Sequence, residues 1–382
     1  MKIAFLTPEY PHPKTGSSGG IGTSIKNLAL GLIAQNAKVI VLVYGQKVDD
    51  IFIDQNIEIH QIKNIKSKGL SWWLTRKKIE NKINQLHKEN KIDIVEAPDW
   101  TGITSFIKPK KCPIVIKLHG SDTYFCDLEG RKVKWINKFH EKRALKNANG
   151  HIAVSKFVAE QTNKVFNQKI NYTVIHNGID VNNFNSVQQE NENHAILYLG
   201  TLIRKKGVLE LRLLFNEVIK EIPNASLHLV GGDSAAILTT STSTWELMKP
   251  LFSSEAITKV TYHGKVPYEK VNHFLEQTTL CIFPSFAEAF PVSWLEAMAK
   301  GKAVVASNIG WGPEVIKNNL EGFLISPTNH VEYANAIISI FKDGELKQNI
   351  QDNARSKVEN SFDINLIAKQ NIIYYKSVID KL

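Results

Sequence analysis

Hydrophobic and polar residues follow one another along this chain in two similar series. Short apolar runs alternate with longer stretches whose apolar residues recur at helical spacing, as in Ile25–Ile33. This alternation is typical of βαβ units and predicts a parallel sheet in each half. We expect strands at Lys2–Thr7, Lys38–Tyr44, Ile57–Ile62, Ile92–Glu96, Ile114–Leu118, Gly150–Val154 and Tyr172–Ile175, and then at Ala195–Leu199, Ser226–Val230, Val260–Tyr262, Leu280–Phe283, Ala303–Ala306 and Phe323–Ile325.

A polar segment, Asp180–His194, separates the two series. It is rich in Asn, Gln and Glu and poor in apolar residues, which indicates an interdomain linker. A chain of 382 residues is too long for one ordinary core and suits two domains of roughly 180 residues each. We therefore predict an α/β protein with two doubly wound parallel-sheet domains, residues 1–180 and 195–362, joined by a linker at 181–194.

The composition is that of a soluble globular protein, with 43% hydrophobic and 22% charged residues. No apolar run approaches the roughly 18 residues that a membrane span requires. The first ten residues lack the layout of a signal peptide, and three cysteines form neither a disulfide framework nor a metal cluster. These features predict a cytoplasmic location.

The net charge of +10 is concentrated in the first half of the chain. Residues 1–185 hold 28 Lys and Arg against 16 Asp and Glu, whereas the remainder holds 19 against 21. A basic first half suggests an anionic partner. Charge alone leaves open nucleic acid, an anionic bilayer surface and a phosphorylated acceptor.

Two glutamates eight residues apart, Glu288 and Glu296, flank the point where a predicted strand ends and a helix begins. Free backbone N–H groups at such a helix start bind phosphates, and carboxylates beside them are able to hold sugar hydroxyls. Glu288 is expected in the loop, and Glu296 about two turns into a helix opened by Pro291. The plain alternative is a solvated loop residue and a surface helix residue.

Two further segments are suited to phosphate binding. The glycine-rich stretch around Gly19 and Gly20 follows the first strand and leads into a helix, so its backbone is able to approach a phosphate closely. Arg204, Lys205 and Lys206 follow the first strand of the second series. The alternatives are an ordinary glycine turn and a solvated charge cluster.

The order and spacing of several short motifs resemble glycosyltransferase family 4, the retaining, nucleotide-sugar-dependent enzymes with the GT-B fold. The resemblance covers nearly the whole chain. It is carried by Gly19-Gly20, His119-Gly120, His176-Asn-Gly-Ile-Asp180, the segment Gly200–Gly207, the pair Glu288 and Glu296 with the following Ala297-Met-Ala, and Gly310-Trp-Gly-Pro-Glu314.

The resemblance implies two Rossmann-like domains that face each other across a cleft, with a final helix at 363–382 returning to the first domain. It assigns the donor-sugar hydroxyls to Glu288, the ribose hydroxyls to Glu296, and a place near the reacting carbon to His119. It also implies that the donor diphosphate is bound by Gly19, Gly20, Arg204, Lys206, Phe290, Pro291 and Val292. The chain departs from the family pattern at Thr201, where many members have arginine, and at Pro291, where many have glycine. We expect Arg204 to substitute for the arginine missing at Thr201.

By this resemblance the chain is a retaining glycosyltransferase that moves a hexose-type sugar from a UDP- or GDP-sugar to a hydroxyl of a growing glycan or lipid-linked acceptor. No Asp-x-Asp triplet is present to hold a divalent cation, so we expect no metal and no other cofactor. The alternatives are an epimerase or phosphorylase of the same fold, or a non-catalytic partner subunit. His176–Asp180 is interpreted as a turn that needs a left-handed glycine.

The acceptor side is expected in the basic first half. Trp72 and Trp73 precede Arg76, Lys77 and Lys78, and tryptophans beside basic residues suit the interface of a bilayer. A second basic run, Arg131–Lys146, lies in the same half. Asp122 is expected to orient His119 or to serve the acceptor. We thus predict a peripheral association with the inner face of the plasma membrane; the alternative is a buried tryptophan among solvated lysines. No nucleic-acid recognition motif is present.

Overall fold

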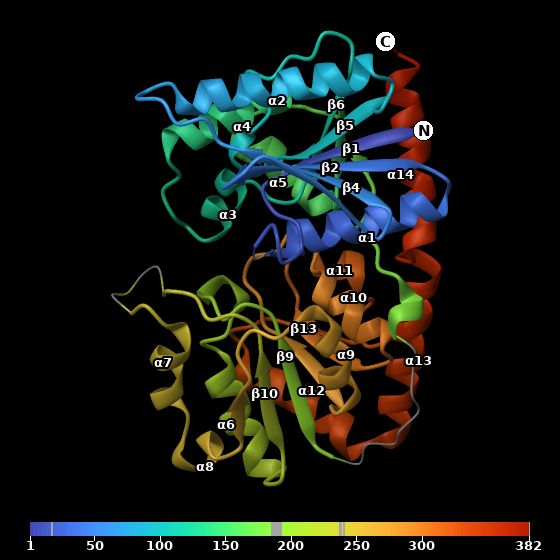
Figure 1. Cartoon of the computed structure of the whole chain (residues 1–382). Helices are drawn as coiled ribbons and strands as arrows, with labels where there is room; N and C mark the ends of the chain where they lie inside the picture. The colour runs from blue at the N-terminus through green and yellow to red at the C-terminus, as the bar shows by residue number, and fades with distance from the viewer. Residues whose placement is uncertain (17, 185–192, 237–238, 240, 382) are drawn as a thin grey trace. The chain divides into compact units, whose positions relative to one another are not determined.

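The computed structural model describes residues 1–16, 18–184, 193–236, 239 and 241–381. The chain divides into two compact units. Unit 1 comprises Met1–Asp180 and Phe362–Leu382, and unit 2 comprises Val181–Ser361. Each unit is built around one sheet with helices packed on it (Figure 1).

The sheet of unit 1 has the strand order β3-β4-β2-β1-β5-β6-β7-β8. Its strands are β1 (Lys2–Thr7), β2 (Lys38–Gln46), β3 (Asp50–Asp54), β4 (Ile57–Lys63), β5 (Ile94–Pro98), β6 (Ile114–Leu118), β7 (Gly150–Ala153) and β8 (Thr173–Val174). All neighbouring pairs are parallel except β3 and β4. The central strands are buried on both faces, which explains their continuous apolar runs.

The edge strand β3 was not predicted. Its apolar residues Ile51 and Ile53 are 56% and 74% exposed, so they leave no signal of a buried strand. The hairpin to β4 turns at Gln55 and Asn56, both with positive φ. A two-residue turn of this kind matches the twist of an antiparallel pair. The sheet of unit 1 is therefore mixed, whereas a fully parallel one was expected.

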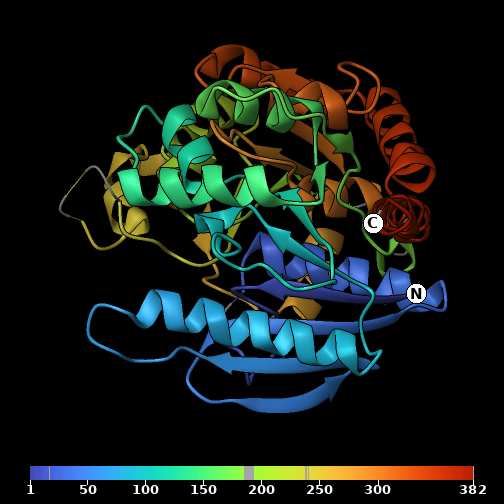
Figure 2. The same cartoon turned by 90° about the horizontal axis from the view of Figure 1, so that it is seen from above.

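The helices of unit 1 are α1 (Gly20–Ala34), α2 (Ser71–Lys88), α3 (Asp122–Leu128), α4 (Trp135–Asn147), α5 (Lys156–Phe166) and α14 (Ile364–Ile379), with the short 3-10 turn η1 (Trp100–Gly102). α1 and α2 lie on opposite faces of the sheet (Figure 1), as right-handed crossovers in opposite directions require. α14 is the last helix of the chain, and the two termini lie on the same side of unit 1 (Figures 1 and 2).

α14 is part of the core of unit 1 because it packs along α1. Its residues Ile364, Ile367 and Tyr375 are buried among strands and α1. Gly31 of α1 permits the close approach, since a Cβ there would lie 2.7 Å from the Ile364 side chain. The Tyr375 hydroxyl donates a 2.5 Å hydrogen bond to the buried Glu96 of β5.

The sheet of unit 2 is parallel throughout, with the order β11-β10-β9-β12-β13-β14. Its strands are β9 (Ala195–Leu199), β10 (Ser226–Val230), β11 (Val260–Tyr262), β12 (Leu280–Phe283), β13 (Ala303–Ser307) and β14 (Phe323–Ile325). Its helices are α6 (Leu211–Glu221), α7 (Thr244–Met248), α8 (Ser254–Ile257), α9 (Val271–Glu276), α10 (Val292–Ala299), α11 (Gly312–Val315), α12 (His330–Lys342) and α13 (Gly344–Ser361), with the 3-10 turns η2 (Val181–Phe184), η3 (Arg204–Lys206), η4 (Lys249–Leu251) and η5 (Tyr268–Lys270). The predicted α/β class with a doubly wound sheet in each half is confirmed.

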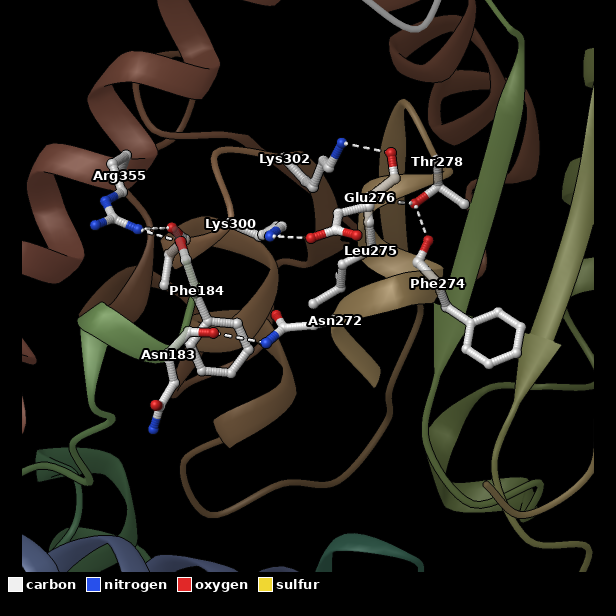
Figure 3. A network of polar contacts seen from close by, with 11 residues as sticks. Asn183, Phe184, Asn272, Phe274, Leu275, Glu276, Thr278, Lys300, Lys302 and Arg355 are labelled. Carbon is white, nitrogen blue, oxygen red and sulfur yellow. Dashed lines mark hydrogen bonds and ion pairs between the residues drawn. The ribbon is translucent and has the colours of Figure 1, made fainter. Parts of the chain in front are cut away.

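The first residues of the predicted linker are a folded part of unit 2. Val181–Phe184 forms η2, and Phe184 is buried. The Asn183 carbonyl accepts a 2.6 Å hydrogen bond from the Asn272 side chain of α9 (Figure 3). Residues 185–192 of the predicted linker lie outside the described residues.

A polar network holds the carboxyl end of α10 (Figure 3). Arg355 of α13 donates to the carbonyl of Ala299, the last residue of α10, and at 2.6 Å to the carbonyl of Phe184. Lys300 forms a 2.7 Å ion pair with Glu276 of α9. Cationic side chains at this end satisfy helix carbonyls and oppose the helix dipole. The network therefore fixes the helix that carries Glu296.

In the described part of the chain, no helix combines the length and the apolar character needed to span a membrane.

Candidate functional site

The residues predicted to bind the donor in unit 2 lie on loops at one edge of its sheet. β9 and β12 are parallel neighbours, so the loops after them leave the sheet at the same edge. The loop after β9 contains Arg204–Lys206, and the loop after β12 contains Ser285–Glu288. The Lys205 carbonyl accepts hydrogen bonds from the backbone N–H groups of Phe286 and Ala287 at 2.8 and 3.2 Å. The two loops are thus held together through their backbones.

Gly207 makes this close approach sterically feasible. Its φ is +68°, and a Cβ at this position would lie 1.8 Å from the Pro284 carbonyl oxygen. Only glycine adopts this backbone conformation readily and leaves room for the neighbouring loop. The sequence Lys206-Gly207 therefore sets both the turn after η3 and its contact with the end of β12.

Lys206 and Glu288 form an ion pair, with 2.5 Å between Lys206 Nζ and Glu288 Oε1. The Ser285 hydroxyl donates to the same carboxylate oxygen at 2.9 Å. Glu288 is only 7% exposed, so the alternative of a solvated loop residue is wrong. The arrangement places a cation and a hydrogen-bond-accepting carboxylate side by side, immediately before α10.

Glu296 is the fifth residue of α10 and is 5% exposed, so it is not a surface helix residue. Helix α10 begins at Val292, after Pro291, which puts Glu296 little more than one turn into the helix where about two were expected. The Tyr268 hydroxyl of η5 donates a 2.8 Å hydrogen bond to Glu296 Oε1. Burial raises the pKa of Glu296 to about 7, and the hydrogen bond from Tyr268 opposes this rise.

Tyr268 was not identified from the sequence. A signal was available in its position, because it follows β11 at the edge of the sheet where the other strand ends carry candidate residues. Its contact with Glu296, however, joins two segments far apart in the chain, and no local pattern predicts that pairing.

The remaining donor-side residues of unit 2 differ in their surroundings. Phe290 and Pro291 are buried directly before α10, and Val292 is its first residue. The amide groups of a first helical turn have no partner within the helix and suit a diphosphate. Arg204 is exposed and forms no ion pair with any residue that the structure describes. Its replacement of the missing family arginine at Thr201 stays a prediction.

In unit 1, His119 directly follows β6 and is 9% exposed. Its backbone N–H donates at 2.9 Å to Oδ1 of Asp99, which follows β5. Burial, reinforced by the charge of Lys117, lowers the pKa of the His119 imidazole to about 3. With this lowered pKa the ring is neutral at physiological pH and is able to form hydrogen bonds without carrying charge.

Asp99, and not Asp122, contacts His119, and it does so at the backbone N–H. The Asp122 carboxylate accepts a 2.9 Å hydrogen bond from the Asn137 side chain, and its backbone N–H donates to Glu141. These contacts hold the start of α3 and do not involve the His119 ring. Burial raises the pKa of Asp99 to about 7. The proposal that Asp122 orients His119 is wrong in this geometry; its role towards an acceptor stays a prediction.

The glycine-rich stretch starts a helix as predicted, with Gly19 preceding α1 and Gly20 as its first residue. One of its first amide groups already has an anionic partner within the chain. The Gly22 N–H donates at 2.9 Å to the Glu9 carboxylate, which lies beside Gly19. This carboxylate is at the end of the helix where a phosphate was expected, so phosphate binding by Gly19 and Gly20 requires Glu9 to share or vacate that position.

The predicted membrane-facing cluster on α2 is only partly at the surface. Trp72 and Trp73 are 44% and 38% exposed. Lys77 pairs with Glu80 at 2.9 Å and Lys78 with Asp49 at 2.6 Å. Arg76 was expected among the exposed cations but is buried, because helical spacing turns it towards η1 and beneath the ring of Trp72.

The turn at His176–Asp180 needs its glycine for another reason than the one predicted. Gly178 does not have the expected positive φ. A Cβ at this position would lie 2.9 Å from the Ile367 side chain of α14. Gly178 is therefore required by close packing of the last helix.

Within the described residues, no group of three or more His, Cys, Asp or Glu side chains is placed to hold a metal ion.

Comparison with known proteins agrees with this geometry. The family described as "Glycosyltransferase Family 4" matches residues 18–183, and the family "Glycosyl transferases group 1" matches residues 181–357. An uncharacterized glycosyltransferase of Methanocaldococcus jannaschii, MJ1607, is 26% identical over 100% of both chains. The N,N'-diacetylbacillosaminyl-diphospho-undecaprenol alpha-1,3-N-acetylgalactosaminyltransferase of Campylobacter jejuni is 26% identical over 77% of this chain and 76% of its own length.

Two solved structures show the same fold. Sucrose-phosphate synthase from Thermosynechococcus elongatus superposes with a TM-score of 0.80 at 19% identity, over 100% of both chains. The HepE protein of Anabaena in complex with UDP-glucose gives a TM-score of 0.75 at 20% identity, over 99% of this chain and 100% of its own. Both sheets thus agree with the GT-B fold, and the chain belongs to glycosyltransferase family 4.

Proposed function

We propose that this glycosyltransferase is a retaining enzyme that transfers a hexose-type sugar from a UDP- or GDP-sugar to a hydroxyl of a growing glycan or lipid-linked acceptor, without a metal ion. The observation that carries the proposal is the Lys206–Glu288 pair directly before α10, with Glu296 buried in that helix. A cation for the diphosphate and two carboxylates for sugar hydroxyls are the groups that a nucleotide sugar requires.

In the proposed reaction, the bond between the anomeric carbon and the diphosphate oxygen breaks while the acceptor oxygen bonds to the same carbon on the same face. The acceptor proton moves to the departing phosphate oxygen. Charge develops on the diphosphate, so Lys206 and the first amide groups of α10 stabilise the transition state most. Glu288 holds hydroxyls of the donor sugar, and the neutral imidazole of His119 supplies a hydrogen bond near the reacting carbon.

The nucleotide and acceptor classes are supported by similar proteins. The Anabaena HepE structures contain UDP or UDP-glucose. The Campylobacter relative is named for a lipid-diphosphate-linked acceptor, and a Bacillus subtilis relative is described as a putative teichuronic acid biosynthesis glycosyltransferase. We extend the proposal to a cytoplasmic enzyme that works on an acceptor at the inner face of the plasma membrane.

Thermal unfolding in the presence of a panel of nucleotide sugars tests the donor class. A ligand at 100 times its Kd adds roughly 2.7 kcal/mol to stability, so a UDP- or GDP-sugar is expected to raise the Tm clearly. With that donor and an acceptor glycan, NMR of the product is expected to show the donor's anomeric configuration, and turnover is expected to persist in EDTA. An inverted product, or turnover that EDTA abolishes and Mg²⁺ restores, would contradict the retaining or the metal-free part of the proposal.

The raised pKa of Glu296 predicts a pH-dependent KM for the donor. The carboxylate form accepts the two ribose hydroxyls best, and it is lost as the pH falls through about 7. The donor KM is therefore expected to rise about tenfold between about pH 8 and about pH 6, with little change in kcat. Steady-state kinetics across this range measure the effect. In Glu296→Gln the donor KM is expected to be high and independent of pH. If the variant kept the pH dependence of the wild type, the titrating group would not be Glu296.

A further inference from the structure

Unit 1 contains an open, largely apolar cavity of about 740 Å³. It lies between α2, the η1 segment and α4, and its walls include the rings of Trp72, Phe106, Trp135 and Phe139. The ring centroids of Trp72 and Phe106 are 5.6 Å apart, and those of Phe106 and Phe139 are 6.4 Å apart. A cavity of this size and character is within the range of small-molecule sites.

The mouth of the cavity exposes large apolar side chains. Trp135 is 77% exposed, Phe139 is 45% exposed, and the neighbouring Ile136 is 39% exposed. Together with Trp72 they line the cavity with apolar side chains from both α2 and α4. Contiguous exposed apolar surface of this kind indicates a binding face.

Arg76 lies in the wall of this cavity and is only 8% exposed. Its guanidinium donates long hydrogen bonds to the carbonyls of Trp72 at 3.3 Å and Gly102 at 3.4 Å, and its carbon lies 5.5 Å from the centroid of the Trp72 ring. Its Nε has no hydrogen-bond partner, and no carboxylate pairs with it, among the residues that the structure describes. A guanidinium group has five N–H donors, and burying its charge without a counter-ion is energetically costly. Arg76 is therefore suited to pair with an anion that enters the cavity.

The surroundings of the cavity attract anions. The segment 130–147, which includes α4, holds seven basic residues and one acidic residue. That residue, Glu141, is buried and accepts hydrogen bonds from the backbone of Thr101, Asp122 and Thr123, so its charge is already compensated. The segment 63–78, which includes the start of α2, holds six basic residues and no acidic one, and four of the six remain after Lys77 and Lys78 pair with Glu80 and Asp49. An amphiphile with an anionic head matches both the apolar walls and this field.

We propose that this cavity binds an anionic phospholipid of the bilayer, with the phosphate on the Arg76 guanidinium and the start of an acyl chain along the rings of Trp135 and Phe139. The exposed rim would then lie in the interfacial region of the membrane, where tryptophan is favoured. The inference rests on the proposed location at a membrane surface but not on the transfer reaction. Its failure would leave donor binding by unit 2 unaffected, which thermal unfolding with the nucleotide sugar reports separately.

Flotation of the full chain with vesicles tests the proposal. Vesicles of phosphatidylcholine containing phosphatidylglycerol are expected to bind the protein, and vesicles of phosphatidylcholine alone are not. Arg76→Gln is expected to weaken vesicle binding about tenfold or more, because the phosphate bound in the cavity loses the cation that pairs with it. The matched control is Lys88→Gln, which removes one exposed charge from the other end of the same helix and is expected to reduce binding at most about fivefold. At high salt the effect of Lys88 is expected to vanish and that of Arg76 to persist.

Tryptophan fluorescence locates the lipid. Phospholipids with brominated acyl chains are expected to quench the emission, and the double variant Trp72→Phe with Trp135→Phe is expected to lose most of that quenching although five tryptophans remain of the seven. Should Arg76→Gln fail to fold, Trp135→Ser with Phe139→Ser changes only exposed side chains and is expected to weaken vesicle binding as strongly. Three outcomes would overturn the lipid site. The first is an equal loss of vesicle binding in Arg76→Gln and Lys88→Gln, and the second is quenching that survives in the double tryptophan variant. The third is complete inhibition of vesicle binding by water-soluble glycerol phosphate.

Discussion

Replacing Glu288 with glutamine is expected to lower kcat by about 10²–10³-fold while the protein stays folded. The change keeps the size of the side chain and the hydrogen bond from Ser285 but removes the charge that pairs with Lys206 at 2.5 Å. Lys206 then loses its fixed position beside α10, and the donor sugar loses a charged acceptor for its hydroxyls. Turnover with the identified donor, together with the circular dichroism spectrum, measures both parts of the expectation.

The matched control for this variant is Glu221→Gln. Glu221 also pairs with a lysine of unit 2, Lys342, at 2.8 Å, but both side chains are more than half exposed and lie away from the donor-side loops. Exposed ion pairs contribute little, so kcat is expected to stay close to that of the wild type. Similar activity in Glu288→Gln and Glu221→Gln would refute the role given to Glu288.

Replacing Gly207 with alanine is expected to lower the free energy of unfolding by at least about 3 kcal/mol and to reduce kcat/KM for the donor sharply. The substitution combines a left-handed backbone at φ +68° with a Cβ 1.8 Å from the Pro284 carbonyl oxygen. Relief of this overlap must move the loop of Lys206 away from that of Glu288. Urea unfolding and donor kinetics measure the two effects.

Gly301→Ala separates backbone strain from steric overlap. Gly301 has nearly the same φ, +69°, but a Cβ there meets nothing within 4 Å. Only the strain of about 1–2 kcal/mol is then expected, with the donor KM unchanged. If Gly301→Ala were as damaging as Gly207→Ala, the contact between the two loops would not be what requires glycine at residue 207.

Most of the fold was predictable because the central strands are buried on both faces. Such strands, β6 and β12 for example, appear in the sequence as short, mainly apolar runs. The edge strand β3 was not predicted from the sequence because it is not a buried strand: its isoleucines face solvent. The antiparallel pairing of β3 depends on a turn of two residues with positive φ, Gln55 and Asn56, and glutamine is not typical of such turns.

The candidate site was predictable where a motif is local and not where it is made by contacts distant in sequence. Lys206 and Glu288 follow strands, so their placement at one edge of the sheet follows from the strand order. Hydrophobic periodicity does not reveal hydrogen bonds between distant loops. Examples are the bond from Tyr268 to Glu296 and the bond from the His119 backbone to Asp99. The burial of Arg76 depended on the direction in which α2 is rotated, which two adjacent tryptophans left ambiguous.

The return of α14 to unit 1 has a consequence for how the protein is made. Unit 2 is a continuous stretch of chain and is available to fold as soon as it leaves the ribosome. The first 180 residues are synthesised earlier but lack Ile364, Ile367 and Tyr375, which complete their core on the face of α1. The apolar face of α1 in the nascent amino-terminal half therefore stays uncovered until α14 has been synthesised, and during this interval it is exposed to aggregation.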